Sequence, residues 1–94
     1  MSTTRSVRLR VTGRVQGVGY RLWAERTAQA LGLRGWVRNS ADGSVELRVT
    51  GATDAVASMI AACRQGPRWA EVDAVEVEEA EDDGSAGFTA RPNA

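Results

Sequence analysis

Apolar and polar residues alternate along this chain in the way that is typical of strands with one buried face. Five segments are expected to form strands: residues 6–12, 36–39, 44–50, 70–79 and 88–91. In the fourth segment the apolar phase changes between Val72 and the Val75/Val77 pair. Such a change of phase predicts either a β-bulge, in which one extra residue turns the following side chains to the other face, or a later start of the strand.

In two other segments the apolar residues recur at helical spacing instead. Apolar residues recur every three or four positions from Tyr20 to Leu31, and again in a segment of about residues 53–64. Gly32 is expected to stop the first helix, and Gln65-Gly66-Pro67 to end the second. Thr53 or Asp54 is expected to cap the second helix with its side chain.

The order of these elements predicts the fold. Two strand–helix–strand units, joined by a hairpin at Asp42-Gly43, indicate an α+β ferredoxin-like βαββαβ sandwich. We expect one antiparallel sheet, two helices on one face and a short extra last strand. A length of 94 residues favours a single domain over 1–94.

The composition then excludes several kinds of chemistry. The twelve basic residues are all arginine and are balanced by twelve acidic ones, so no net field favours nucleic acid or a membrane. Without histidine or lysine there is no imidazole base and no lysine Schiff base. The lone Cys63 lies on the apolar face of the second helix, where we expect a buried thiol. The first residues lack the apolar run of a signal peptide, so a cytoplasmic monomer is expected.

Candidate chemistry lies in the segment that joins the first strand to the first helix, Gly13-Arg14-Val15-Gln16-Gly17-Val18-Gly19-Tyr20-Arg21. We call residues 13–19 the glycine loop. Glycines let consecutive main-chain N–H groups turn inward around an anion, and the start of the helix adds unpaired N–H groups. Arg21 adds a planar charge that suits phosphate oxygens. The loop has neither the Gly-Lys-Ser/Thr of a nucleotide P-loop nor the third glycine of a dinucleotide site.

A second candidate is Asn39, which stands before the turn that contains Asp42-Gly43. An asparagine in this position often serves only to form a turn. The predicted topology also lets it approach the glycine loop, because the first helix returns the chain to the same sheet.

The segment Gly13–Arg21 resembles the first signature of the acylphosphatase family. Gly35-Trp36-Val37-Arg38-Asn39-Ser40-Ala41-Asp42-Gly43-Ser44-Val45-Glu46 resembles the second, and Leu31-Gly32-Leu33 between them also fits. The likeness extends from the first strand to Phe88. It implies hydrolysis of an acyl phosphate, a small-molecule substrate, to a carboxylate and inorganic phosphate, with no cofactor, no metal and no covalent intermediate.

The resemblance also implies individual roles. Arg21 is expected to bind the substrate phosphate, and Asn39 to orient the attacking water. The main-chain amides expected to complete the phosphate site belong to Val15, Gln16, Gly17, Val18, Gly19 and Tyr20. Tyr20 stands where phenylalanine is common, which places a hydroxyl near the phosphate site with little expected effect. Trp69 occupies a position where small residues are more usual.

Two other functions suit the same order of elements. An RNA-recognition domain needs exposed aromatic residues on its central strands, and residues 6–12 and 44–50 contain none. A non-catalytic domain that binds phosphate or carbamoyl phosphate, as in hydrogenase maturation proteins, is a closer alternative. Turnover of an acyl phosphate would distinguish the enzyme from that alternative.

Overall fold

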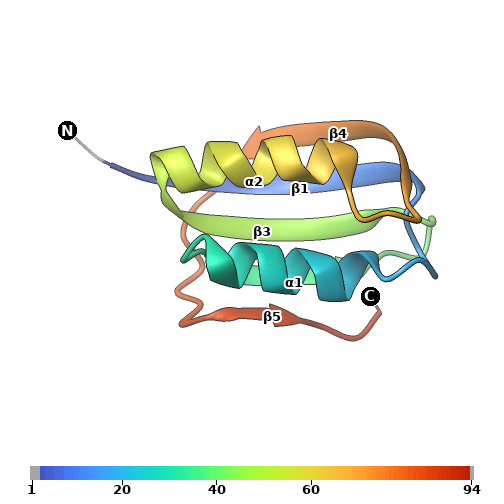
Figure 1. The fold of residues 1–94 in the computed structure, drawn as a ribbon. Coiled ribbons are helices and arrows are strands. Elements are labelled where there is room, and N and C mark those ends of the chain that lie inside the picture. The colour runs from blue at the N-terminus through green and yellow to red at the C-terminus, as the bar shows by residue number, and fades with distance from the viewer. Residues whose placement is uncertain (1–2, 94) are drawn as a thin grey trace.

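The computed structural model describes residues 3–93. Its elements follow the expected order: β1 (Thr4–Arg14), α1 (Tyr20–Ala30), β2 (Arg34–Asn39), β3 (Val45–Ala52), α2 (Thr53–Gln65), β4 (Glu71–Glu79) and β5 (Phe88–Ala90). Figure 1 shows the two helices side by side on one face of the sheet, with the C-terminus beside the start of α1. The predicted ferredoxin-like α+β fold is confirmed.

The five strands form one sheet in the order β4-β1-β3-β2-β5. Strands β1 to β4 pair antiparallel, as expected for the βαββαβ core. Strand β5 pairs parallel with β2 and makes the sheet a mixed one. The predicted bulge is present: Thr12 faces Ala74 and Gly13 faces Val72, so Asp73 is the extra residue in β4.

A single core fills the space between the helices and the sheet. Val7, Leu9 and Val11 of β1 contribute the inward side chains that their alternation predicts, and Val56, Met59 and Cys63 of α2 cover them. Burial of such side chains supplies the main favourable term in folding. Cys63 is fully buried, as expected.

The opposite face of the sheet carries charged residues in pairs. Arg8 and Arg38 both contact Glu46, and Arg10 contacts Glu76 and Asp42. Opposite charges therefore pair across neighbouring strands on this face of the sheet. Burial tends to raise the pKa of Glu46, but hydrogen bonds from Arg38 and Arg8 outweigh that effect and lower it.

The expected cap of the second helix is wrong. Ala52 occupies the N-cap position of α2, and no side chain caps the helix. The hydroxyl of Thr53 donates instead to the carbonyl of Thr3, as does the Thr53 main-chain N–H. The carbonyl of Thr3, just before β1, thus accepts the hydrogen bond of the Thr53 hydroxyl, and this hydroxyl does not cap the helix.

Candidate active site

The glycine loop ends in a run of main-chain amides without protein partners. No N–H group of residues 15–20 donates to any other residue within 3–93. Gly17 and Gly19 have φ angles of 73° and 81°, which a residue with a side chain rarely adopts. Gly19 is the N-cap of α1, so the helix begins directly at the loop and adds the positive end of its dipole. This combination can receive an anion.

Arg21 lies in the first turn of α1 and is partly buried. One of its guanidinium nitrogens, Nη1, donates to the carbonyl of Arg91 at 3.0 Å. Arg21 forms no ion pair with any carboxylate of the described residues. The guanidinium is therefore held at one nitrogen by the C-terminal segment while its charge remains uncompensated.

Asn39 is the last residue of β2 and lies opposite Val45 in the pairing with β3. Asn39 stands two residues after the buried Val37, and alternate residues of a strand point to the same face of the sheet. Its side chain therefore lies on the face that the helices cover. Its carboxamide makes no hydrogen bond to another residue in 3–93. A half-buried amide of this kind has a donor and an acceptor available for water or a ligand.

One pocket brings these groups together, with a volume of about 410 Å³. Its walls include Val15, Gly17, Gly19, Tyr20, Arg21, Leu22, Asn39 and Ala90. Asn39, which follows Arg21 by 18 positions in the sequence, thus shares one space with Arg21 and the loop. Of the residues expected in the site, Gln16 and Val18 do not line this pocket.

The side chain of Gln16 connects the loop to the β2–β3 turn. Its Nε2 donates to the carbonyls of Ser40 and Ser44, both at 2.8 Å. Ser40 directly follows Asn39, so these bonds fix the loop against the strand end that carries the carboxamide. Sequence reasoning considered only the main-chain amide of Gln16 and missed this second role. Its signal was a long polar side chain between two glycines.

Side chains on one stripe of α1 hold strand β5. Glu25 accepts the N–H of Ala90 at 2.8 Å, and Gln29 donates to the carbonyl of Phe88 at 3.0 Å. Together with Arg21 these residues are spaced four apart, which places them on one helix face. Sequence reasoning also missed this contact, although the i, i+4, i+8 spacing of polar residues was a readable signal.

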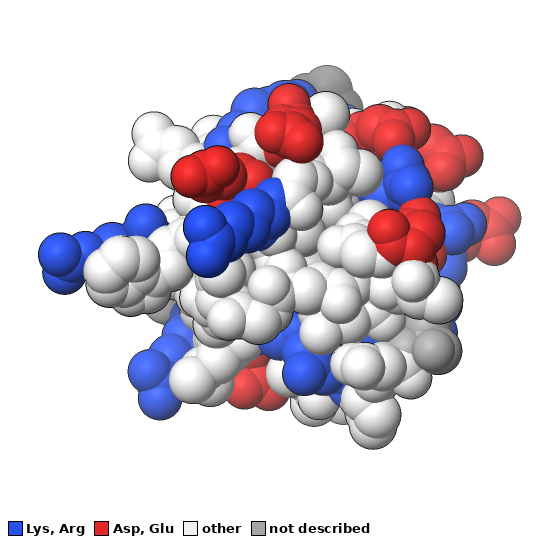
Figure 2. Space-filling model, turned by 90° about the vertical axis from the view of Figure 1, so that its right-hand side faces the viewer, with Lys and Arg blue, Asp and Glu red and all other residues white. Residues whose placement is uncertain are grey.

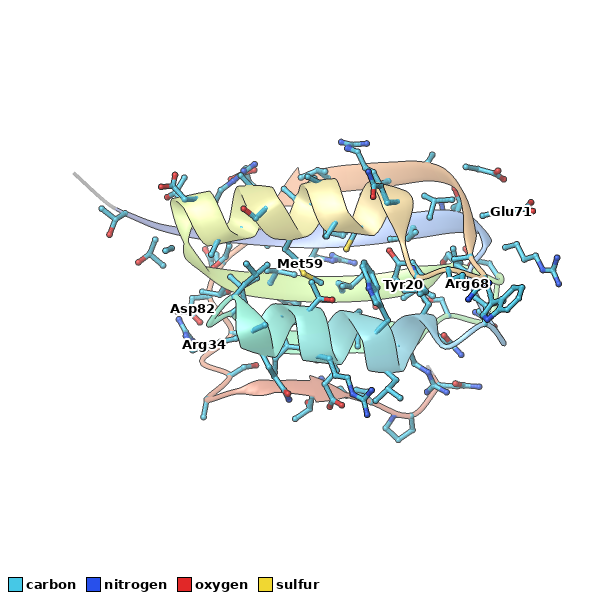
Figure 3. All side chains as sticks on the ribbon, viewed as in Figure 1. Tyr20, Arg34, Met59, Arg68, Glu71 and Asp82 are labelled. Atoms are coloured by element: carbon cyan, nitrogen blue, oxygen red, sulfur yellow. The ribbon has the colours of Figure 1, made fainter. Side chains whose placement is uncertain are left out.

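The expectation for Tyr20 needs correction. Its ring is 1% exposed, and its hydroxyl donates to the carbonyl of Cys63 at 2.9 Å, inside the core. Figure 3 shows Tyr20 pointing between the helices and the sheet. The hydroxyl therefore stabilises the packing of α1 against α2 and does not face the pocket. Burial raises the pKa of Tyr20, and burial also raises the pKa of Cys63 to about 11.

Comparisons with known proteins identify the family of the chain. The family model described as Acylphosphatase matches residues 7–90. A relative from Rhodopseudomonas palustris (strain BisB5), named Acylphosphatase, is 60% identical over 84 residues, which cover 88% of this chain and 83% of that protein. No helix within residues 3–93 is long and apolar enough to cross a membrane.

Solved structures share the fold. An acylphosphatase from Coxiella burnetii superimposes with a TM-score of 0.91 at 32% identity, covering 95% of this chain and 94% of that one. Full-length HypF, in a phosphate- and nucleotide-bound form, matches with a TM-score of 0.88 at 24% identity. The match covers 96% of this chain but only 12% of HypF, and it indicates a common fold alone.

Proposed function

The chain belongs to the acylphosphatase family, and from this premise we propose that its pocket hydrolyses acyl phosphates through Arg21, the glycine loop and Asn39. The observation that carries the proposal is the pocket shared by a guanidinium without a carboxylate partner, free main-chain amides and a free carboxamide. Each of the three supplies something that this reaction needs.

The loop and Arg21 bind the phosphoryl group. The N–H groups of Val15 to Tyr20 donate to its oxygens, and Arg21 contributes a full positive charge beside them. During the reaction charge is spread over these oxygens, so donors already fixed in place stabilise the transition state without reorganisation. In this role the glycine loop is a phosphate-binding loop.

Asn39 holds the attacking water. Its carboxamide oxygen accepts a hydrogen bond from the water, whose oxygen then attacks phosphorus. The bond between phosphorus and the acyl oxygen breaks, and the carboxylate leaves with the bonding electrons. The proton of the water passes to the phosphoryl oxygens, because Asn39 cannot act as a strong base. The products are a carboxylate and inorganic phosphate.

The acyl phosphate is a mixed anhydride, and its own reactivity explains why the site needs few catalytic groups. Its carboxylate is a good leaving group, so the protein needs to position a water molecule and stabilise charge, and no covalent nucleophile is required. The buried Cys63, whose pKa is raised to about 11 by burial, remains an unreactive thiol.

We also propose that the protein acts as a monomer in the cytoplasm. The equal numbers of acidic and basic residues give no net charge that would attract the protein to a membrane surface or to nucleic acid. Within residues 3–93, Leu22 and Trp69 are the only exposed large apolar side chains, which is little for an obligate dimer interface.

The test is turnover of benzoyl phosphate in the presence of excess chelator. Wild-type protein is expected to hydrolyse it, and Arg21→Ala and Asn39→Ala each to lose roughly 10²- to 10³-fold in kcat/KM, as when fixed oxyanion donors are removed elsewhere. Arg26→Ala, a change at a position of the same helix without an ion pair, is the matched control. Tight binding of phosphate without turnover would instead indicate the non-catalytic binding domain.

A further inference from the structure

A second hollow lies beside the pocket that contains Arg21 and Asn39. Its volume is about 610 Å³, and its walls are formed by Arg14, Gly17, Val18, Arg68, Trp69, Ala70 and Glu71. Gly17 borders both spaces. A Cβ built on Gly17 would meet no atom within 4 Å outside its chain neighbours, so the space beside this residue is open. We call this second space the Trp69 hollow.

Trp69 is the most exposed large apolar side chain among the described residues. It is 69% exposed, and the guanidinium of Arg68 lies 5.1 Å from the centre of its ring. Figure 3 shows Arg68 and Glu71 at the end of the molecule where Tyr20 and α1 begin. An indole that is held by a cation at its ring and otherwise faces solvent offers a flat apolar surface to a ligand.

The walls of the hollow combine apolar surface with charged groups. Val18 and Ala70 add apolar surface beside Trp69, and the other walls carry the guanidinium groups of Arg14 and Arg68 and the carboxylate of Glu71. Seen from this end, uncharged surface covers the middle of the molecule, and basic and acidic side chains lie around it (Figure 2). The apolar part of the hollow, with the indole of Trp69, is where an acyl group can pack.

The reaction geometry directs the acyl group toward this hollow. In the proposed hydrolysis the attacking and leaving oxygens lie on opposite sides of phosphorus. Asn39, which holds the attacking water, lines the first pocket and not the Trp69 hollow. With the phosphate on the glycine loop and the water at Asn39, the adjoining space that Asn39 does not line is the Trp69 hollow, which borders the loop at Gly17.

We propose that the Trp69 hollow is the acyl-group subsite and that it selects acyl phosphates with a flat aromatic acyl group, which stacks on Trp69. The inference rests on the proposed function, since it assumes that the phosphate lies on the loop. Stacking of two rings is present in the bound substrate and in the transition state alike. It therefore lowers KM and leaves kcat unchanged.

Trp69→Ala tests the subsite with two substrates. The KM for benzoyl phosphate is expected to rise about three- to tenfold, the range set by aromatic pairing, while kcat and the KM for acetyl phosphate change less than about twofold. Trp69→Phe is expected to restore most of the difference. Equal changes for both substrates, or no change for either, would overturn the proposal.

Leu22→Ala is the matched control, because Leu22 is the other exposed large apolar residue and lines the pocket on the Asn39 side. Its substitution is expected to leave the ratio of the two KM values unchanged. A changed ratio in this variant but not in Trp69→Ala would place the acyl group on the Asn39 side and contradict the in-line argument.

Calorimetry with non-hydrolysable phosphonates separates this inference from the proposed function. Benzoylphosphonate is expected to bind wild-type protein more tightly than acetylphosphonate, and Trp69→Ala is expected to remove that difference. If wild-type protein shows the difference in binding but no turnover, the subsite stands and the proposed function fails. If turnover occurs without any dependence on Trp69, the proposed function stands and the subsite fails.

Discussion

At the scale of single residues, the site combines a guanidinium, at Arg21, with a carboxamide, at Asn39. The sequence contains no histidine, the side chain that most often changes its charge near neutral pH. Burial holds Tyr20 and Cys63 in their neutral forms, with the pKa of Cys63 raised to about 11. The pocket therefore works by position and fixed charge.

This residue chemistry predicts the pH dependence of turnover. Between about pH 6 and 8, the range that a histidine would control, kcat for benzoyl phosphate is expected to stay constant. Steady-state rates in buffers of constant ionic strength measure it. A steep transition that does not follow the ionisation of the substrate would indicate an enzymatic base and contradict the role given to Asn39.

The contacts of Gln16 give a second prediction at this scale. Gln16→Glu keeps the shape of the side chain but replaces the N–H donors that serve the carbonyls of Ser40 and Ser44. We expect a loss of about 1–2 kcal/mol in stability and a roughly ten- to hundredfold loss in kcat/KM, because the loop moves relative to Asn39. Urea unfolding and turnover measure the two effects.

Gln16→Ala is the comparison for that variant. It also removes the donors but brings no charge to the carbonyls, so its stability is expected to lie between those of wild type and Gln16→Glu. If both variants keep wild-type turnover, the side chain does not position the loop.

Sequence reasoning found most of the residues that line the pocket, but not Leu22, Ala90 or the hydrogen bonds that hold the site together. The glycine spacing and the position of Asn39 before a turn are local patterns, and the topology then brings the two together. Gln16 and Tyr20 were less accessible, since the direction of a polar side chain depends on partners far away in sequence. Tyr20 bonds to the carbonyl of Cys63, 43 positions away.

At the scale of elements, strand β5 forms part of the candidate site. It pairs with β2, supplies Ala90 to the pocket wall, and leads to the carbonyl that accepts from Arg21. Helix α1 grips it through Glu25 and Gln29. The alternation of residues 88–91 predicted a strand, whereas its parallel direction depends on the path of residues 80–87, which no periodicity encodes.

Glu25→Ala tests whether the hydrogen bonds between α1 and β5 contribute to stability and to substrate binding. Loss of the hydrogen bond to the N–H of Ala90 is expected to cost about 1 kcal/mol and to speed hydrogen exchange at that amide. KM for the acyl phosphate is expected to rise a few-fold, because the carbonyl that holds Arg21 becomes more mobile. Arg26→Ala, at the next position of α1, should change neither quantity. Unchanged exchange at Ala90 in Glu25→Ala would contradict the role of α1.

At the scale of the whole molecule, arginine and carboxylate side chains form ion pairs between neighbouring strands and between the sheet and its connecting segments. Arg34 lowers the pKa of Asp82 to about 2 through a hydrogen-bonded ion pair, and Arg5 lowers the pKa of Glu79 in the same way. Figure 3 shows Arg34 and Asp82 at the end of the molecule opposite Arg68. These exposed pairs lie away from the pocket and affect stability rather than chemistry.

The direction of these shifts predicts the response of stability to acid. Because the carboxylates of the folded protein have lower pKa values than those of the unfolded chain, the unfolded state binds more protons, and stability falls as pH falls from about 5 toward 2. Urea midpoints at pH 7, 5 and 3 measure the trend. Salt at 1 M should flatten it, since the pairs are exposed. A midpoint that rises on acidification would contradict this assignment.

The central claim is a division of labour, in which Arg21 and the loop bind phosphate while Asn39 acts only on water. Titration of inorganic phosphate into three proteins by calorimetry tests it most directly. Asn39→Ala is expected to bind phosphate within about twofold of wild type although its turnover is lost, whereas Arg21→Ala is expected to bind at least tenfold more weakly. If Asn39→Ala loses phosphate binding, or Arg21→Ala retains it, the division of labour is wrong.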